Sequence, residues 1–175
     1  VPDFMVDGIK YSMKGKGEVG VVAINDTTKY EGDIILPETI SYNSTTYTLT
    51  TICTGAFNQC YNLIHVSIPA TVNTIDKEAF VNGSPNIECL AMTPPTCANS
   101  SFRNVSGKAY IPEGTLDLYQ SATGWSNFDY IIESAYIPDF TVDGIIYTLL
   151  GKNYVGVVAS ELQNAEYSSQ RNVLS

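Results

Sequence analysis

The sequence predicts a β-rich α/β solenoid, a fold in which short repeats stack as layers that each hold one strand and one turn. Three observations lead to this prediction. The apolar clusters have the length of strands, a spacing of 23 residues recurs between similar apolar residues, and the polar residues are mainly Ser, Thr and Asn, which supply 45 of the 175 residues. Periods of about 20 to 50 residues are typical of solenoids. Charged residues make up only 15%, which is unlike a Lys/Glu-rich helical protein.

The 23-residue spacing defines the layers expected between residues 30 and 95. An Ile-x-x-x-Ala-Phe segment fits a single helical or 3-10 turn, and an alternating segment such as Val66-x-Ile68 fits a strand. Pro69 ends that strand because proline donates no ladder hydrogen bond. An insertion between Ile40 and Leu49 is expected to form a protruding hairpin. The recurring residues are Leu49, Ile52, Ala56 and Phe57, which reappear as Val72, Ile75, Ala79 and Phe80.

The chain also repeats itself over a longer distance. Residues 2–23 and 138–159 align at a fixed offset of 136 with fifteen identities in twenty-two positions. Each copy reads as a hairpin. In the first copy the arms are residues 9–13 and 19–23, joined by the flexible turn Gly15-Lys16-Gly17, and in the second copy the arms are residues 145–149 and 154–159. The Asp-Gly pairs at 7–8 and 143–144 also fit turns. We therefore predict one cassette over residues 1–136 and the start of a second, incomplete cassette over residues 137–175. The first cassette divides into a lead-in hairpin (1–29), repeats (30–95) and a closing cap (96–136).

The second hairpin has few layers of its own to cover it. Its strand edges are therefore expected to pair with the preceding cassette or with another chain, so hairpin-mediated self-association is predicted. The tail from Glu161 to Ser175 contains few large apolar residues and is expected to pack poorly. Because the second cassette is unfinished, we expect the sequence to be a piece of a longer protein.

The closing cap is expected to contain the one helix. Thr115 is placed to cap its N-terminus, the helix covers 116–122, and Gly124 supplies a left-handed residue after its end. Trp125 follows the helix stop, where a core anchor is favoured over an exposed platform for a sugar ring.

Net charge and hydropathy exclude several classes of partner. Nine basic against eighteen acidic residues give a net charge of -9 and a pI of about 4.4, which opposes nucleic acid and anionic lipid. No run of eighteen apolar residues occurs, so no membrane insertion is expected. The composition favours an exported protein. Residue 1 is Val rather than Met and no signal peptide follows it, so any export signal is expected to have been removed or to lie outside this sequence.

Four cysteines lie close together in the sequence, at Cys53, Cys60, Cys89 and Cys97. Their number allows two disulfides, a zinc site or buried thiols. No Cys-x-x-Cys pair occurs, and His65 is the only histidine, so a zinc site is disfavoured. Buried thiols are the favoured interpretation, and oxidation of a pair stays open.

Residues 30–133 resemble the BspA-like leucine-rich repeats of bacterial surface proteins, a family abundant among Bacteroides and related organisms. The resemblance rests on the runs 52–63, 66–69 and 75–80, and on the closing segments Thr93-Pro-Pro, Ala109-Tyr-Ile-Pro and Gly124-Trp-Ser-Asn-Phe128. It implies a solenoid with an N-terminal hairpin and a C-terminal capping helix, and it implies that Cys60 and Cys89 are buried. The chain departs from longer members of the family in having only about two full units.

The inventory of groups for catalysis is small. His65 is expected on the exposed face of a strand as an ordinary solvated imidazole. No nucleophile elbow, phosphate-binding loop or dinucleotide fingerprint occurs, and the Asp-Gly pairs read as turns rather than as a calcium loop. A hydrolase would require two carboxylates about 5 to 9.5 Å apart in a cleft. We therefore predict that the chain is not an enzyme and needs no cofactor and no metal.

The remaining candidate for function is a surface. A solenoid presents one row of outward side chains per strand, which suits it to bind another macromolecule. The 23-residue register places six residues on that row or on the neighbouring hairpin. These candidate binding residues are Tyr42, Tyr47, His65, Ser67, Glu88 and Leu90.

The resemblance implies a non-catalytic, adhesion-type protein-binding module, secreted or on the outer cell surface. Its partner would be a host, matrix or bacterial surface protein. Two alternatives stay open. The twelve tyrosines and single tryptophan allow a carbohydrate-binding module with a flat row of exposed rings, and repeated cassettes also suit a structural spacer.

Overall fold

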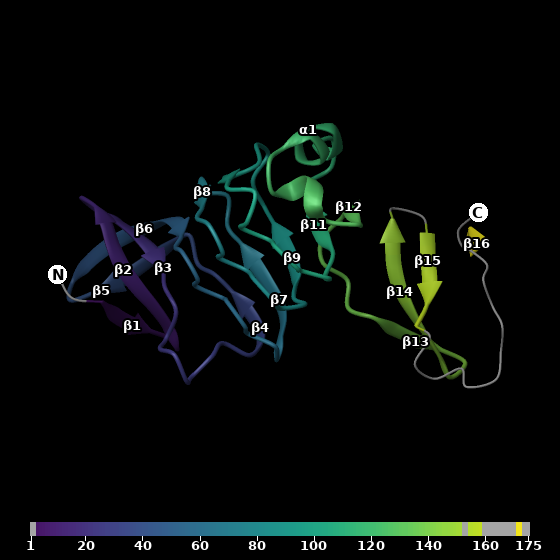
Figure 1. Ribbon diagram of the computed structural model, residues 1–175, viewed down its shortest axis with the longest axis horizontal. Coiled ribbons are helices and arrows are strands. Elements are labelled where there is room, and N and C mark those ends of the chain that lie inside the picture. Colours follow the sequence, from purple (N-terminus) through teal and green to yellow (C-terminus); the bar gives the residue numbers. More distant parts are fainter. Residues whose placement is uncertain (1–2, 152–153, 159–170, 173–175) are drawn as a thin grey trace.

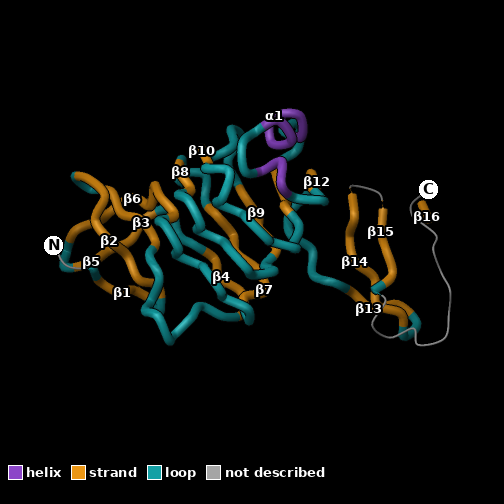
Figure 2. Tube along the Cα trace, viewed as in Figure 1, coloured by secondary structure: helices purple, strands orange, loops and turns teal. Residues whose placement is uncertain are grey.

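The structure is a computed structural model that describes residues 3–151, 154–158 and 171–172. It is rich in strands and has one short α-helix among these residues (Figures 1 and 2). The elements in chain order are β1 (Phe4–Val6), β2 (Ile9–Gly15), β3 (Glu18–Val21), β4 (Gly32–Ile35), β5 (Thr39–Tyr42), β6 (Thr45–Ile52), β7 (Leu63–Ile68), β8 (Thr74–Ile75), β9 (Asn86–Cys89), β10 (Thr96–Cys97), β11 (Ala109–Ile111), α1 (Leu116–Ser121), the 3-10 helix η1 (Trp125–Asn127), β12 (Ile131–Glu133), β13 (Phe140–Val142), β14 (Ile145–Gly151), β15 (Tyr154–Val157) and β16 (Arg171–Asn172).

Two sheets enclose the core of the repeat region. One is parallel throughout, in the order β12-β11-β9-β7-β4. The other begins with the antiparallel lead-in hairpin β1-β2-β3 and continues in parallel through β6, β8 and β10, with β5 on β6. Buried side chains from both sheets form one cluster. Figure 1 shows the successive layers side by side, with the lead-in hairpin at one end and the second hairpin, β13 to β15, at the other.

Stacked aromatic rings run through the layers. Phe57 and Phe80 lie 4.8 Å apart at an angle of 12°, as the 23-residue spacing predicts. Tyr30 precedes them at 4.9 Å from Phe57, and Phe102 follows at 5.4 Å from Phe80. Trp125 closes the column at 4.9 Å from Phe102. Because each ring contacts the next, burial of apolar surface is continuous along the whole repeat region.

The strand register differs from the predicted one by two residues. In the sheet that contains β6 and β8, Ile52 lies opposite Ile75, so the 23-residue spacing holds there. In the other sheet Ile68, not Val66, lies opposite Cys89. Side chains alternate with a period of two along a strand, so a shift of two keeps each residue on its predicted side. The predicted adjacency of these strands is confirmed, and Val66 and Cys89 both lie in the core.

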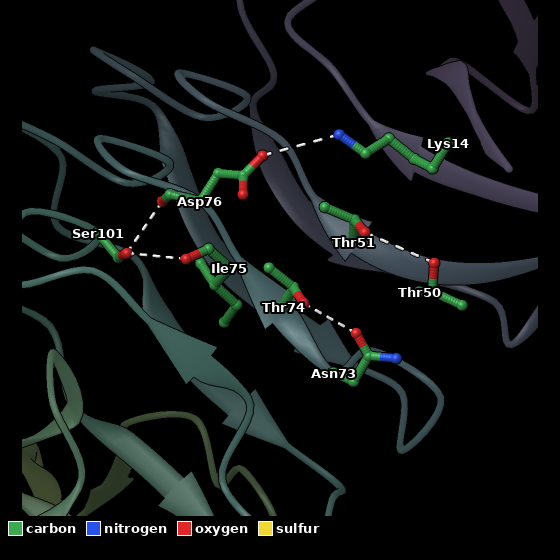
Figure 3. Close-up of polar contacts among 8 residues, drawn as sticks. All are labelled: Lys14, Thr50, Thr51, Asn73, Thr74, Ile75, Asp76 and Ser101. Atoms are coloured by element: carbon green, nitrogen blue, oxygen red, sulfur yellow. Dashed lines mark hydrogen bonds and ion pairs between the residues drawn. The ribbon is translucent and has the colours of Figure 1, made fainter.

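A third turn, not recognised as a repeat in the sequence, stacks on the first two. Ser101 and Phe102 take the places that Ala79 and Phe80 hold one layer earlier, and Phe80 N donates to Ser101 O at 2.8 Å. The buried Ser101 hydroxyl lies 2.9 Å from the carbonyl oxygens of both Ile75 and Asp76 (Figure 3). At this position the earlier layer has the apolar side chain of Ala79, whereas the third layer contacts the preceding layer through hydrogen bonds of the Ser101 hydroxyl.

The closing segment contains the predicted helix, but its ends differ from the prediction. The Thr115 hydroxyl donates to Pro112 O at 2.6 Å and makes no cap bond. The first backbone N–H, at Leu116, donates instead to a Glu133 carboxylate oxygen at 3.0 Å. The helix ends at Ser121 with Ala122 as its C-cap, so Gly124, with a φ of 83°, is instead the N-cap residue of η1. Trp125 is fully buried, which confirms it as a core anchor.

Both predicted hairpins are present, as β2–β3 and β14–β15. An Asp-Gly turn with positive φ, at 7–8 and at 143–144, joins a further antiparallel strand, β1 or β13, to each hairpin. The inserted hairpin between Ile40 and Leu49 is also present, as β5 and β6. In the described part of the chain the second hairpin forms a separate sheet, in which β15 pairs with β16. Residues 159–170 and 173–175, which include most of the tail predicted to pack poorly, lie outside the described residues.

All four cysteines lie in the described core as buried free thiols, the interpretation that the sequence favours. Burial raises the pKa of each thiol above its ordinary value, to about 12 for Cys97. A thiol is a much weaker nucleophile than a thiolate, so these groups act as small apolar side chains.

Candidate functional site

The candidate site is the outward face of the parallel sheet β4-β7-β9-β11. Strand pairing places two rows of outward residues across this face. Asp33, His65 and Asn86 form one row. The other row contains Ile35, Ser67, Glu88 and Tyr110. The structure therefore brings three of the predicted binding residues together, namely His65, Ser67 and Glu88.

His65 and Ser67 are not exposed, and that expectation was wrong. Each is only 5% exposed. The side chain of Tyr136 covers them, because its ring stacks on His65 at 3.9 Å and 9°. The same ring meets Tyr110 edge-on at 5.3 Å. The segment that leads from the first cassette to the second hairpin therefore covers the middle of this face.

Glu88 fixes the covering segment through its carboxylate. One carboxylate oxygen accepts the backbone N–H of Tyr136 at 2.9 Å. The other accepts the hydroxyl of Ser67 at 2.7 Å. Bonds to a charged acceptor are shorter and stronger than neutral ones. Two of the predicted binding residues, Ser67 and Glu88, thus help to hold Tyr136 in place.

Two opposing effects act on the His65 imidazole. Burial lowers its pKa, while the nearby carboxylates of Glu88 and Asp33 raise it by a smaller amount, so the net direction is downward. The Nε2 atom lies 3.8 Å from a Glu88 oxygen, beyond hydrogen-bond distance, and has no partner among the described residues. Desolvation outweighs the attraction, and the folded state favours the neutral ring.

Acidification is expected to destabilise the fold through His65. Its folded pKa lies below the unfolded value of 6.5, so the unfolded chain binds the proton more tightly, and stability is full above that value and falls as the pH drops below it. Urea unfolding of wild type and His65→Gln at about pH 7.5 and 5.5 measures the difference. The wild type should lose more stability than the variant. An equal loss, or a gain on acidification, would contradict the buried neutral ring.

The outer part of the same face is open. Ile35, on the edge strand β4, is 79% exposed although it lies in the same row as Ser67. It lines a groove of about 500 Å³ between the lead-in hairpin and β4 and β5. Asp7 and Asp33 add two exposed carboxylates, and Thr39 and Ser41 add hydroxyl groups, to a lining that also includes apolar side chains such as Val6. The groove is therefore partly apolar and partly polar, with an acidic part.

The other predicted residues lie away from this groove. Tyr42 and Tyr47 are half-buried and pack against Phe4, whose ring stacks on Tyr42 at 4.1 Å. Their rings support the lead-in hairpin and do not form a flat exposed row. Leu90 is 50% exposed and lines a second groove of about 310 Å³ with Glu88 and Tyr110.

Asp33, Ile35 and Tyr136 were not among the predicted site residues. For Tyr136 a signal existed, because Ala-Tyr-Ile-Pro occurs at both 109–112 and 135–138. The repetition suggests a second strand, yet residues 135–138 form none. For Asp33 and Ile35 a signal also existed, because Leu36-Pro37 ends this strand as Ile68-Pro69 ends the next one, which aligns Ile35 with Ser67 and Asp33 with His65.

The chemistry of this face suits binding. Among the described residues no group of three or more His, Cys, Asp and Glu side chains is arranged to hold a metal ion. No helix in the described part of the chain is long and apolar enough to cross a membrane. The open part of this face has apolar surface and exposed carboxylates. Beside it lie β1 and β4, which are the edge strands of their sheets among the described residues.

Comparisons with known proteins agree with this fold. The profile of the family described as "BspA type Leucine rich repeat region (6 copies)" matches residues 22–113, which is more than half of the chain. A comparison with curated protein sequences gives no match. Among solved structures, a leucine-rich repeat protein from Bacteroides ovatus is similar with a TM-score of 0.47 and 16% identity over 75% of this chain and 47% of that chain.

Two further solved structures are similar. A leucine rich cell surface protein from Faecalibacterium prausnitzii has a TM-score of 0.41 and 13% identity, over 84% of this chain and 58% of that one. The pneumococcal vaccine antigen PcpA has a TM-score of 0.40 and 12% identity, over 75% and 40%. The chain thus spans between 40% and 58% of these proteins. On the strength of the profile match, the chain belongs to the BspA-type leucine-rich repeat family.

Proposed function

We propose that the chain is a non-catalytic, adhesion-type protein-binding module that works outside the cell or on the outer cell surface. The family supports this, because BspA-type homologues are cell-surface proteins and are generally not enzymes. The proposal includes a solenoid arrangement of the layers, with one cassette over residues 1–136 and the start of another over residues 137–175. The partner would be a host, matrix or bacterial surface protein.

The observation that carries the proposal is the open groove beside β4. An isoleucine that is 79% exposed at the end of a row of largely covered residues is unusual for a solvated surface. The groove lies between β1 and β4, which are both edge strands. Edge strands can pair with an extended peptide, whose alternate side chains then enter the groove. The carboxylates of Asp7 and Asp33, in a chain of net charge -9, favour a segment with basic residues.

Ile35→Lys is expected to weaken binding of such a partner by about tenfold or more, because it removes apolar contact and places a positive charge where a basic segment would bind. The measurement is surface plasmon resonance against matrix proteins, bacterial surface proteins and basic peptides. Ile64→Lys is the matched control, since Ile64 is 56% exposed on the neighbouring strand and lies outside the groove lining. Equal binding by both variants and the wild type would contradict the groove as the site.

A glycan array separates the carbohydrate alternative from this proposal. Glycan binding that is lost in Tyr42→Ala and Tyr47→Ala but retained in Ile35→Lys would favour a carbohydrate-binding module. Because both tyrosines pack against the lead-in hairpin, each variant needs a check by circular dichroism that the hairpin stays folded.

A further inference from the structure

The strand β4 has backbone groups that no other described residue binds. It ends its sheet, with β7 on one side only (Figure 1). The backbone N–H groups of Gly32 and Leu36 donate to carbonyl oxygens on or just before β7, at 2.8 and 3.0 Å. Successive residues of a strand direct their backbone groups to opposite sides. The N–H and carbonyl groups of Asp33 and Ile35 therefore point away from β7, to the free edge.

The strand β1, on the other side of the groove, offers fewer such groups. The two-residue turn at 7–8 makes Val6 and Ile9 a hydrogen-bonded pair, so Phe4 and Val6 direct their backbone groups to β2. Of the three residues of β1, only Met5 directs its groups to the free side. An added segment can therefore pair with two residues of β4 but with only one residue of β1.

Both ends of the free edge of β4 are closed. Pro37, just after the strand, has no N–H to donate. Gly32, at the start of the strand, has a φ of 69°, which turns the chain out of the extended conformation. Short edge strands and proline at their ends limit unselective pairing of sheets. The edge therefore suits a short extended segment.

The outward side chains of β4 set two requirements for that segment. A residue that pairs with Asp33 or Ile35 directs its side chain to the same face of the sheet. Asp33 is exposed on this face, so a basic residue fits opposite its carboxylate. Ile35 is 79% exposed, so an apolar residue opposite it removes apolar surface from water. The basic and the apolar residue are then two positions apart.

The residue between them points to the other face, on the side of Ile34. Ile9, Ile34 and Ile40 line the groove there and are 9%, 8% and 2% exposed. A polar side chain would lose water at this place without gaining a partner from these three residues, so an apolar side chain fits better. The groove therefore favours a basic residue and two apolar residues in consecutive positions.

We propose that β4 binds its partner by strand addition, and that the partner supplies an extended segment with a basic residue opposite Asp33, an apolar residue facing Ile34 and an apolar residue opposite Ile35. The order is basic-apolar-apolar in a parallel segment and apolar-apolar-basic in an antiparallel one. This inference rests on the proposed function, which places binding in the same groove, and adds the conformation and sequence pattern of the bound segment. The β4 strand of a second copy, Gly-Asp-Ile-Ile, has no basic residue and does not fit the pattern.

Amide hydrogen exchange of the full chain, measured by NMR, tests the strand pairing. The probes are short peptides with Lys-Val-Val or Val-Val-Lys between threonine flanks. In the free protein the amides of Asp33 and Ile35 should exchange about tenfold or more faster than those of Ile34 and Leu36, at every protein concentration. A saturating amount of one of the peptides should slow exchange of the first two amides. No slowing with either peptide, or slowing at high protein concentration alone, would overturn the proposal.

N-methylation of the three central peptide amides separates strand pairing from other ways of binding in the groove. The methyl groups remove the donors and keep the side chains, so binding should be lost. Equal binding by the methylated peptide would overturn strand addition and leave the groove as the binding site. Failure of the groove itself gives a different result, because the unmethylated peptide would then bind Ile35→Lys as tightly as the wild type.

Asp33→Lys tests the position of the basic residue. This variant should bind the Lys peptide about tenfold or more weakly than the wild type does, and should prefer a peptide with glutamate in place of the lysine. Glu31→Lys is the matched control, since it changes the net charge equally and Glu31 is exposed outside the groove lining. The control should keep the preference for lysine. The same reversal of preference in both variants would overturn the pairing of the basic residue with Asp33.

Discussion

Replacing Phe80 with alanine is expected to destabilise the chain by about 3–5 kcal/mol, the usual range for removing a buried phenylalanine. Phe80 is 1% exposed and occupies the middle of the aromatic column. Its ring stacks on Phe57 at 4.8 Å and on Phe102 at 5.4 Å. The variant therefore leaves a cavity and also separates the first turn from the third, so both neighbours lose a ring contact.

Urea unfolding followed by the fluorescence of Trp125 gives the free energy of unfolding. Phe80→Leu keeps most of the volume and provides a measurable variant if Phe80→Ala fails to fold; its loss should be clearly smaller. Tyr61→Ala is the control, since Tyr61 is 69% exposed, and its effect should stay within about 0.5 kcal/mol. A loss below about 1 kcal/mol for Phe80→Ala would show that the column contributes little.

Replacing Gly107 with alanine is expected to cost about 2 kcal/mol or more, because the backbone has no room for a methyl group. A Cβ at this position would lie 1.8 Å from the carbonyl oxygen of Pro85 and 2.6 Å from its carbonyl carbon. These atoms belong to the backbone just before β9, so they cannot move aside as a flexible side chain can. The loop before β11 would have to move away from β9, with loss of the bonds between them.

Gly83→Ala is the matched control one layer earlier. Gly83 is buried and Gly107 is half-buried, but a Cβ at Gly83 would meet nothing closer than Pro85 Cδ at 3.4 Å. Thermal unfolding of both variants should give a large fall in Tm for Gly107→Ala and a small change for Gly83→Ala. Similar falls in the two variants would show that the close approach of Gly107 to Pro85 relaxes at little cost.

The repeat spacing was sufficient to predict the layers and their cores. Apolar residues that recur with a fixed period must share an environment, so the stacking of Phe57 on Phe80 followed from the sequence alone. The third layer was missed because Ser101 stands where the frame has alanine. Its hydroxyl is satisfied by two carbonyl groups of the preceding layer, and a sequence pattern does not reveal such long-range bonds.

The candidate site was predicted less well than the fold. The alternation of side chains correctly placed His65 and Ser67 on the outward face of their strand, but it does not show what covers that face. The cover is Tyr136, about seventy residues away in the sequence and held by Glu88. Ile35 holds the same repeat position as Ser67, but it is 79% exposed, and the repeat position alone does not show this difference.

The attachment of Tyr136 has a mechanical consequence. The chain leaves the closing segment at β12 and is then fixed again on β7 and β9, through the ring of His65 and the carboxylate of Glu88. Tension applied beyond residue 137 therefore reaches the central strands first and pulls across them, while α1 and η1 lie outside the line of force. Under such tension, the contact of Tyr136 with His65 and Glu88 would bear load before α1 and η1 do.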